Sequence, residues 1–262
     1  MVFYYIIVFL FGLAFGSFLN VVISRIDKPE TIFRGRSRCP QCGKDLKWFD
    51  LIPLVSYFLV RGKCRYCQKP ISVQYPLVEL ATGTGFLMLF WEFGLSLSFF
   101  ISAFFFLILE AIFVLDLLRG IIPNKIVIPA IILALLLDLI VLGFSGISEQ
   151  RILIFEPTIL NIILGGLLGG ILFFILALAS EEKIMGMGDG KLGVFIGLIL
   201  GYPLVLVALI LAFLFGGGVG ILLLASGKKR RRDKISFGPF LALAAFITII
   251  WGKDILFWYL MY

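Results

Sequence analysis

A series of long apolar stretches constrains this chain more than any other feature. Crossing the hydrocarbon core of a bilayer takes about 20 mostly apolar residues, and several stretches here reach that length. Over the whole chain 61% of the residues are apolar and 15% are charged, whereas a soluble domain has roughly 45–50% and about 25%. This composition excludes a soluble globule and a disordered chain. It predicts an all-α polytopic membrane protein.

Charged residues, glycine and proline divide these stretches into eight predicted transmembrane helices. Gly201-Tyr202-Pro203 splits the longest apolar run into two of them. The predicted helices cover residues 1–24, 76–91, 98–118, 123–142, 158–179, 192–200, 204–225 and 238–256. The predicted domains are a first helix (1–26), a polar insert (27–74) and a seven-helix core (75–262).

The basic residues predict the orientation of these helices. Lys and Arg collect in cytoplasmic loops, and eight alternating spans place all but two of the 23 basic residues on one side, the exceptions being Arg151 and Lys253. We therefore expect a lipid bilayer as the surroundings, a cytoplasmic insert and both termini outside. The basic run 228–232 could bind nucleic acid or anionic lipid, but a topological signal is the favoured interpretation, and no nucleic-acid partner is expected.

Histidine is absent from the chain. That excludes Ser-His-Asp and Cys-His mechanisms as well as every histidine-ligated metal site. Acid–base chemistry near neutral pH would therefore depend on carboxylates, Lys, Tyr or Cys.

All four cysteines lie in the polar insert, as two C-x-x-C pairs formed by Cys39 with Cys42 and Cys64 with Cys67. Two such pairs can supply four thiolates to one tetrahedral ion, which favours zinc. A redox or iron–sulfur site is the alternative, but the cytosol is reducing and no thioredoxin-like pattern surrounds the pairs. Four protein ligands leave no open position, so we expect a structural zinc that folds the insert.

Two aspartates lie near the same predicted membrane face. Asp116 is close to the end of one helix, and Asp189 follows Gly186 and Gly188 at the start of another. Ionisable residues at such depth are functional candidates, and the bare backbone of the glycines would let a substrate strand approach. Two carboxylates sharing one water form the aspartic-protease arrangement. Salt bridges to Arg119 and Lys191 are the structural alternative.

Three further carboxylates interrupt apolar runs, at Glu79, Glu110 and Asp138. Each could equally hold helices together through interhelical hydrogen bonds. Only Glu79 lies near enough to the insert to contact a ligand held there.

The order of the motifs resembles the bacterial type IV prepilin peptidases, a family of GxGD-type membrane aspartic proteases. The similarity covers nearly the whole chain. The matching segments are 16–22, the double C-x-x-C insert ending at 62–64, 75–80, Asp116 with 122–124, 186–192 and 237–241. Two positions depart from the usual family pattern: Leu118 and Asn124 stand where an aspartate is common.

This resemblance implies catalysis by Asp116 and Asp189, with Gly186 and Gly188 in the active-site loop. Such enzymes cut the basic leader from prepilins and pseudopilins after a glycine, at the cytoplasmic face of the bacterial inner membrane. Many also methylate the new N-terminal amine with S-adenosylmethionine. Gly62 and Lys63, beside Cys64, and Glu79 are the candidates for that second reaction.

Two other classes of function compete with this one. A transporter or proton-coupled carrier would use the intramembrane carboxylates as a relay, but the matching halves typical of transporters are not visible. A pilin-binding scaffold would need no buried acids. The peptidase interpretation is therefore favoured.

Overall fold

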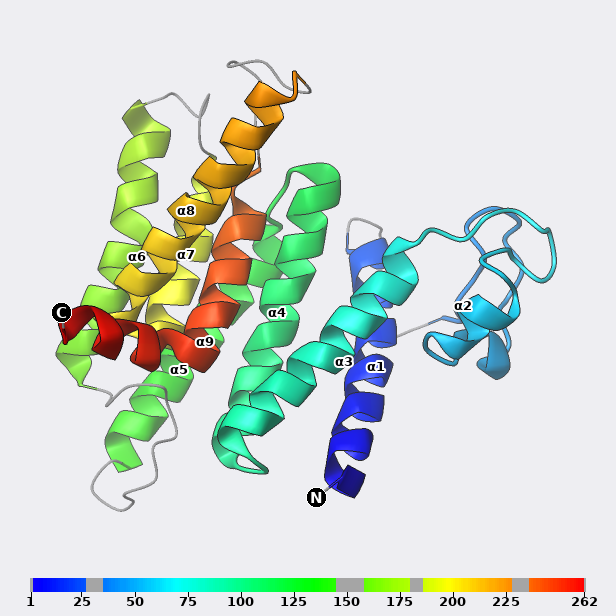
Figure 1. Ribbon diagram of the computed structural model, residues 1–262, viewed down its shortest axis with the longest axis horizontal. Coiled ribbons are helices and arrows are strands. Elements are labelled where there is room, and N and C mark those ends of the chain that lie inside the picture. Colours follow the sequence, from blue (N-terminus) through cyan, green and yellow to red (C-terminus); the bar gives the residue numbers. More distant parts are fainter. Residues whose placement is uncertain (1, 27–34, 145–157, 180–185, 228–235, 262) are drawn as a thin grey trace. The chain divides into compact units, whose positions relative to one another are not determined.

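The computed structural model (Figure 1) confirms an all-α chain over the residues that it describes, which are 2–26, 35–144, 158–179, 186–227 and 236–261. These residues contain no strand, only isolated bridges in the insert. The basic run 228–232, Arg151 and Lys183 lie outside them. Among the described residues, five helices are long and apolar enough to cross a membrane: α1 (Val2–Arg25), α4 (Leu97–Arg119), α6 (Ile159–Ala179), α8 (Leu204–Ala225) and α9 (Gly238–Leu260).

Helices also form at the other three predicted positions. These are α3 (Gln74–Phe93), α5 (Asn124–Phe144) and α7 (Met187–Leu200), while the insert holds the short η1 (Trp48–Leu51) and α2 (Val55–Leu59). At 1.5 Å per residue the 14 residues of α7 extend about 21 Å, less than the roughly 30 Å of a hydrocarbon core. The eight helical segments are thus confirmed, whereas eight full spans are not.

The beginning of α7 differs from its predicted position, because the helix starts at Met187 and not at Leu192. The backbone N–H of Gly186 donates a hydrogen bond to the Asp189 carboxylate (3.3 Å). An acidic side chain in the first turn offsets the positive end of a helix. Asp189 therefore lies inside the helix and stabilises its N-terminus.

The chain divides into two compact units, Met1–Leu107 and Ile108–Tyr262, with the boundary inside α4. In the first unit α1 packs on α3 through small residues. A Cβ added to Gly12 would lie 2.8 Å from the Cα of Gly83, and one added to Gly16 would lie 2.7 Å from the Cα of Glu79. Lipid tails supply no hydrophobic drive between helices, so close backbone packing of this kind holds them together.

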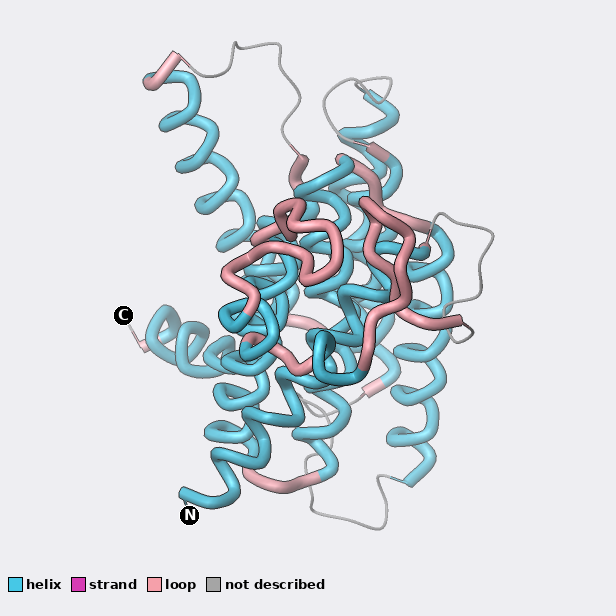
Figure 2. The backbone as a smooth tube through the Cα atoms, turned by 90° about the vertical axis from the view of Figure 1, so that its right-hand side faces the viewer, coloured by secondary structure: helices cyan, strands magenta, loops and turns pink. Residues whose placement is uncertain are grey.

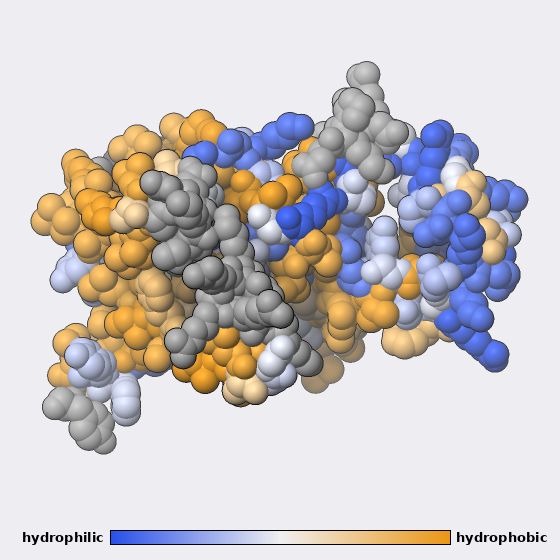
Figure 3. Space-filling model, turned by 90° about the horizontal axis from the view of Figure 1, so that it is seen from above, coloured by the Kyte–Doolittle hydropathy of each residue, from blue (hydrophilic) through white to orange (hydrophobic). Residues whose placement is uncertain are grey.

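The insert (27–74) differs from the helices in its secondary structure and in its surface. Figure 2 draws its described part mostly as loop, with two short helical segments. Hydrophilic side chains predominate on the described part of the insert in Figure 3, with some exposed apolar residues such as Trp48 and Phe58, whereas apolar side chains dominate the surface of the helices. Helices α6 and α8 expose large apolar residues such as Ile163, Leu167 and Leu214, which suits contact with lipid.

Helix α7 is the centre of the second unit, where it contacts α5, α6, α8 and α9. Its contact with α6 is made of backbone against backbone. A Cβ on Gly193 or Gly197 would collide with the carbonyl groups of Gly169 or Gly165. The rings of Phe173, Phe213 and Phe237 join α6, α8 and the residue before α9, with the first two stacked at 6.0 Å.

Candidate active site and metal centre

The two predicted aspartates come together in the second unit. Asp116 lies near the end of α4 and Asp189 in the first turn of α7, and their side chains are buried at 5% and 8% exposure. They are close enough for the charge of Asp116 to act on Asp189. The pair is therefore formed by residues 73 positions apart in the sequence.

Gly238 packs against Asp116, and Ile122 lies beside Gly238. A Cβ on Gly238 would lie 3.1 Å from the Cγ of Asp116 and 3.2 Å from the Cδ1 of Ile122. A Cβ on Gly188 would lie 3.1 Å from the Cβ of Ile122. Ile122 thus packs between the entry of α9, which lies against Asp116, and the Gly188 turn, which precedes Asp189.

Ser236 also interacts with the Asp116 carboxylate through its side chain. Among the described residues, however, Oδ2 of Asp116 is buried and receives no hydrogen bond. Asp189, in contrast, is tied to its own turn, since Gly186 donates to its carboxylate and accepts from its backbone N–H (3.1 Å). The two carboxylates therefore have different surroundings, one held by a turn and one with an oxygen left available.

Lys191 forms no salt bridge with Asp189 among the ion pairs of the described residues. Its ammonium donates a hydrogen bond to Oδ1 of Asn124 (2.8 Å), at the start of α5. This contact joins α7 to α5. It also gives Asn124, one of the two departures from the family pattern, a structural partner beside the site.

The glycines around Asp189 differ in the space that they leave. A Cβ on Gly190 would lie 2.6 Å from the ring of Phe174, so that glycine is required by packing. A Cβ on Gly186 would meet nothing closer than 3.9 Å. Of the three glycines, Gly186 therefore offers the most open backbone.

The four cysteines form a single cluster, as predicted. The Sγ atoms of Cys39, Cys42, Cys64 and Cys67 all lie within 4.8 Å of one another, and those of Cys39 and Cys67 are 4.0 Å apart. Four thiolates at about 2.3 Å from a tetrahedral ion would be separated by about 3.8 Å. The cluster could hold one metal ion.

The two halves of the cluster share one backbone pattern. Gly43 donates to the carbonyl of Cys39 (2.9 Å), and Gln68 donates to that of Cys64 (2.8 Å). Both residues lie in the left-handed region, Gly43 with φ +71° and Gln68 with φ +57°. Each C-x-x-C pair thus forms a turn that directs its two thiols toward the same point.

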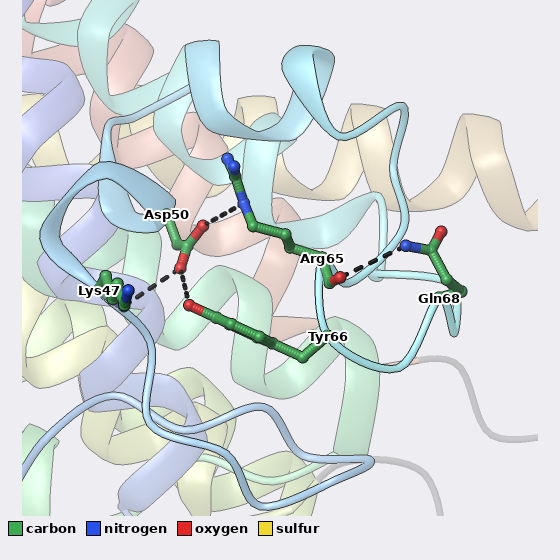
Figure 4. Close-up of polar contacts among 5 residues, drawn as sticks. All are labelled: Lys47, Asp50, Arg65, Tyr66 and Gln68. Atoms are coloured by element: carbon green, nitrogen blue, oxygen red, sulfur yellow. Dashed lines mark hydrogen bonds and ion pairs between the residues drawn. The ribbon is translucent and has the colours of Figure 1, made fainter.

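Asp50 connects the segment between the pairs to the second turn (Figure 4). Its carboxylate accepts hydrogen bonds from the backbone of Lys47 (3.1 Å), Nε of Arg65 (3.1 Å) and the hydroxyl of Tyr66 (2.9 Å). The Arg65 carbonyl in turn accepts from Gln68 (3.4 Å). The hydrogen bond to Asp50 raises the pKa of Tyr66 above its ordinary value, since it holds the phenol in its protonated form.

The three candidate residues for methyl transfer differ in whether they line a cavity. Glu79 lines a cavity of about 720 Å³ between α1, the insert and α3, whereas Gly62 and Lys63 do not. Gly62 has φ +68°, and a Cβ there would lie 3.0 Å from the hydroxyl oxygen of Tyr57, which does line the cavity. Gly62 therefore lies outside the lining and packs against Tyr57, which forms part of the cavity wall.

Residues 10–93 match the bacterial peptidase A24 N-terminal domain, and residues 101–221 match the type IV leader peptidase family. The chain belongs to that family. It is 31% identical to a prepilin leader peptidase/N-methyltransferase of Aeromonas hydrophila, with 98% of this chain and 94% of the relative covered. A relative of the same name from Xanthomonas campestris is 31% identical, with coverage of 96% and 92%.

A third relative, a prepilin leader peptidase/N-methyltransferase of Myxococcus xanthus, is 34% identical over 87% of this chain and 66% of its own length. No solved structure matches the chain. The boundary between the two family matches lies between 93 and 101, close to the boundary of the compact units after Leu107.

The sequence places Ile122 in the motif segment 122–124 that accompanies Asp116, but it assigns neither Ser236 nor Gly238 to the site. In the sequence, the segment 237–241 indicates only the entry of the last helix. Its Gly-Pro pair is a local signal for a helix start, and nothing local indicates that this start packs against Asp116, 122 residues earlier.

Proposed function

We propose that this type IV leader peptidase removes the basic leader of prepilins and pseudopilins with Asp116 and Asp189, and N-methylates the new N-terminus. The observation that carries the peptidase assignment is the pair of buried carboxylates from α4 and α7, close enough to interact. Relatives that cover nearly the whole chain are named for both activities.

The reaction needs one ionised and one protonated carboxylate. The ionised group takes a proton from water while the water oxygen attacks the scissile carbonyl carbon, and the protonated group donates to the carbonyl oxygen. The tetrahedral intermediate then collapses as a proton moves to the leaving nitrogen. The C–N bond breaks, which leaves a leader that ends in a carboxyl group and a pilin with a free amine.

The helix ends favour one assignment of these roles. Asp189 lies at the positive N-terminal end of α7, where a negative charge is stabilised, and Asp116 lies near the negative end of α4. Each helix end contributes about 0.3–1 kcal/mol. In this proposal Asp189 is the base, and Asp116, with its unpartnered Oδ2, carries the shared proton and donates it to the substrate. Spectroscopy that places the proton on Asp189 near neutral pH would refute the assignment.

The cysteine insert and the active site are proposed to face the cytoplasm of a bacterial inner membrane. All but two of the basic residues fall on that side if the eight helices alternate.

Prepilin added to inside-out membrane vesicles that contain the enzyme should lose its leader, as read by intact mass. Sealed right-side-out vesicles should leave the same prepilin uncut, because the site would face the lumen. Cleavage in the right-side-out vesicles alone would reverse the orientation, and cleavage in neither would contradict the peptidase function.

Zinc is the metal that we propose for the cysteine cluster. Four cysteine ligands give a closed tetrahedral site that holds structure and does not take part in catalysis. Its binding would fold an insert in which few apolar side chains are buried.

Freshly purified reduced enzyme should therefore contain one zinc per chain by elemental analysis. Replacing Cys64 with serine should lower that content and impair methylation more than cleavage, because the insert and the aspartates belong to different units. A Ser56→Ala variant, which alters the insert without touching a thiol, should keep its zinc. The absence of zinc from the wild-type protein would overturn the assignment, and an equal loss of both activities in Cys64→Ser would show that the insert also shapes the protease site.

A further inference from the structure

The cavity of about 720 Å³ lies wholly within the first unit. Its volume falls in the range of small-molecule sites, roughly 300–1,000 Å³. Polar side chains line it from three directions: Ser17 and Asn20 from α1, Tyr57 from α2, and Glu79 from α3. Nothing in the chemistry of the aspartate dyad uses this space.

The side-chain oxygen of Asn20 accepts no hydrogen bond from the described residues. Its side chain is only 2% exposed, and its amide nitrogen donates to the carbonyl of Tyr75 (3.1 Å). That bond fixes the orientation of the amide, yet Oδ1 has no hydrogen-bond partner among the described residues. A buried carbonyl oxygen of this kind is costly unless a ligand or water supplies the missing donor.

The carboxyl group of Glu79 is buried, and no basic side chain is among its hydrogen-bond partners. One oxygen accepts from the backbone N–H of Leu54 (2.8 Å), and the Ser17 side chain also hydrogen-bonds to the carboxylate. Both partners are uncharged. Leu54 is held with φ +57°, a strained backbone conformation that is more often found at functional sites. A cationic group of a ligand would suit this position.

Asp50, the other acidic residue of the lining, already has a cationic partner in Arg65. The remaining charged residues are basic: Arg25, Arg36, Arg38, Arg65 and Lys69. A lining with more basic than acidic residues disfavours the basic leader of a prepilin as the occupant. It suits a zwitterionic ligand with a carboxylate for the basic groups and a cation for Glu79.

We propose that this cavity binds S-adenosylmethionine, with Asn20 accepting a hydrogen bond from it and Glu79 facing its cationic part. This molecule combines a carboxylate, an ammonium, a sulfonium, ribose hydroxyls and an adenine. The rings of Tyr57, Tyr66 and Tyr75 also line the cavity and offer apolar faces to an adenine. The inference rests on the N-methyltransferase part of the proposed function and is independent of the aspartate dyad.

Equilibrium dialysis of labelled S-adenosylmethionine against the purified full-length enzyme tests this site by binding alone. Asn20→Ala should lower the affinity at least tenfold, and Glu79→Gln at least fivefold, because the amide can still accept from Leu54 but carries no charge. Two matched variants on α3 should bind like wild type: Glu92→Gln and Thr84→Ala, both at exposed positions away from the cavity lining.

Leader cleavage and zinc content check that the variants are folded, and both should remain at wild-type levels. Wild-type affinity in both Asn20→Ala and Glu79→Gln would overturn the proposal. So would photo-crosslinking that attaches the labelled donor only to peptides outside the cavity. Failure of the aspartate mechanism would appear instead as leader cleavage that persists without Asp116 or Asp189, which leaves the binding result unaffected.

Discussion

Replacing Asp116 or Asp189 with asparagine is expected to abolish leader cleavage. An amide can neither accept the proton of the attacking water nor deliver one to the substrate carbonyl, and removal of positioned acid–base catalysis costs about 10²–10⁴-fold. The loss should be at least of this size for each variant. The double variant should be hardly slower than either single one, because the two carboxylates act as one unit. The measurement is the rate of leader removal from a purified prepilin by intact mass.

The matched readout is methylation of a pilin that has already been cleaved. Both variants should retain it, because neither aspartate lies in the unit that contains the insert and the cavity. Asp254→Asn, on α9 and exposed, serves as the control and should cut at the wild-type rate. Leader removal at an ordinary rate by either Asp116→Asn or Asp189→Asn would refute the dyad.

Adding one methyl group at Gly193 is expected to disturb the second unit strongly. The new Cβ would collide with the backbone carbonyl of Gly169, which cannot rotate away as a side chain can. Overpacking costs about 1–3 kcal/mol even where side chains can adjust, so Gly193→Ala should reach or exceed the upper value. Helix α7 would have to move relative to α6, and Asp189 in its first turn would move with it. We therefore expect a lower thermal midpoint and a severe loss of cleavage.

Gly217 offers a control with the same chemical change. It lies within α8, and an added Cβ would meet nothing within 4 Å. Gly217→Ala should leave cleavage unchanged and should not lower the thermal midpoint, since alanine is the better helix former. Equal behaviour of Gly193→Ala and Gly217→Ala would show that the α6–α7 packing is looser than the structure indicates.

Much of this protein could be anticipated from local patterns. The apolar stretches predicted all eight helical segments within a few residues, apart from the start of α7. The C-x-x-C spacing predicted the four-thiol cluster, because each pair forms a turn of its own and needs only to meet the other. The motif around Asp189 predicts a functional carboxylate, and the role of that residue stays a prediction.

Other features depend on contacts between distant segments, and local patterns carry no sign of them. The approach of Gly238 and Ser236 to Asp116 is one, and the bond between Lys191 and Asn124 is another. From the sequence alone, the glycines of α6 and α7 suggest only a flexible backbone. The structure shows why glycine is required there: any Cβ would collide with the backbone of the partner helix.

The sequence by itself determined the all-α membrane class, the helical segments and the chemistry of the candidate residues, because composition, hydrophobic length and short spacings act locally. Only the tertiary structure decided which helices touch, that Asp116 and Asp189 interact, and that Asn20 and Glu79 line one cavity. The physical reason is the solvent. In lipid an apolar helix face gains little by choosing one apolar neighbour over another, so helix pairing depends on the fit of small residues and buried polar groups across the whole fold.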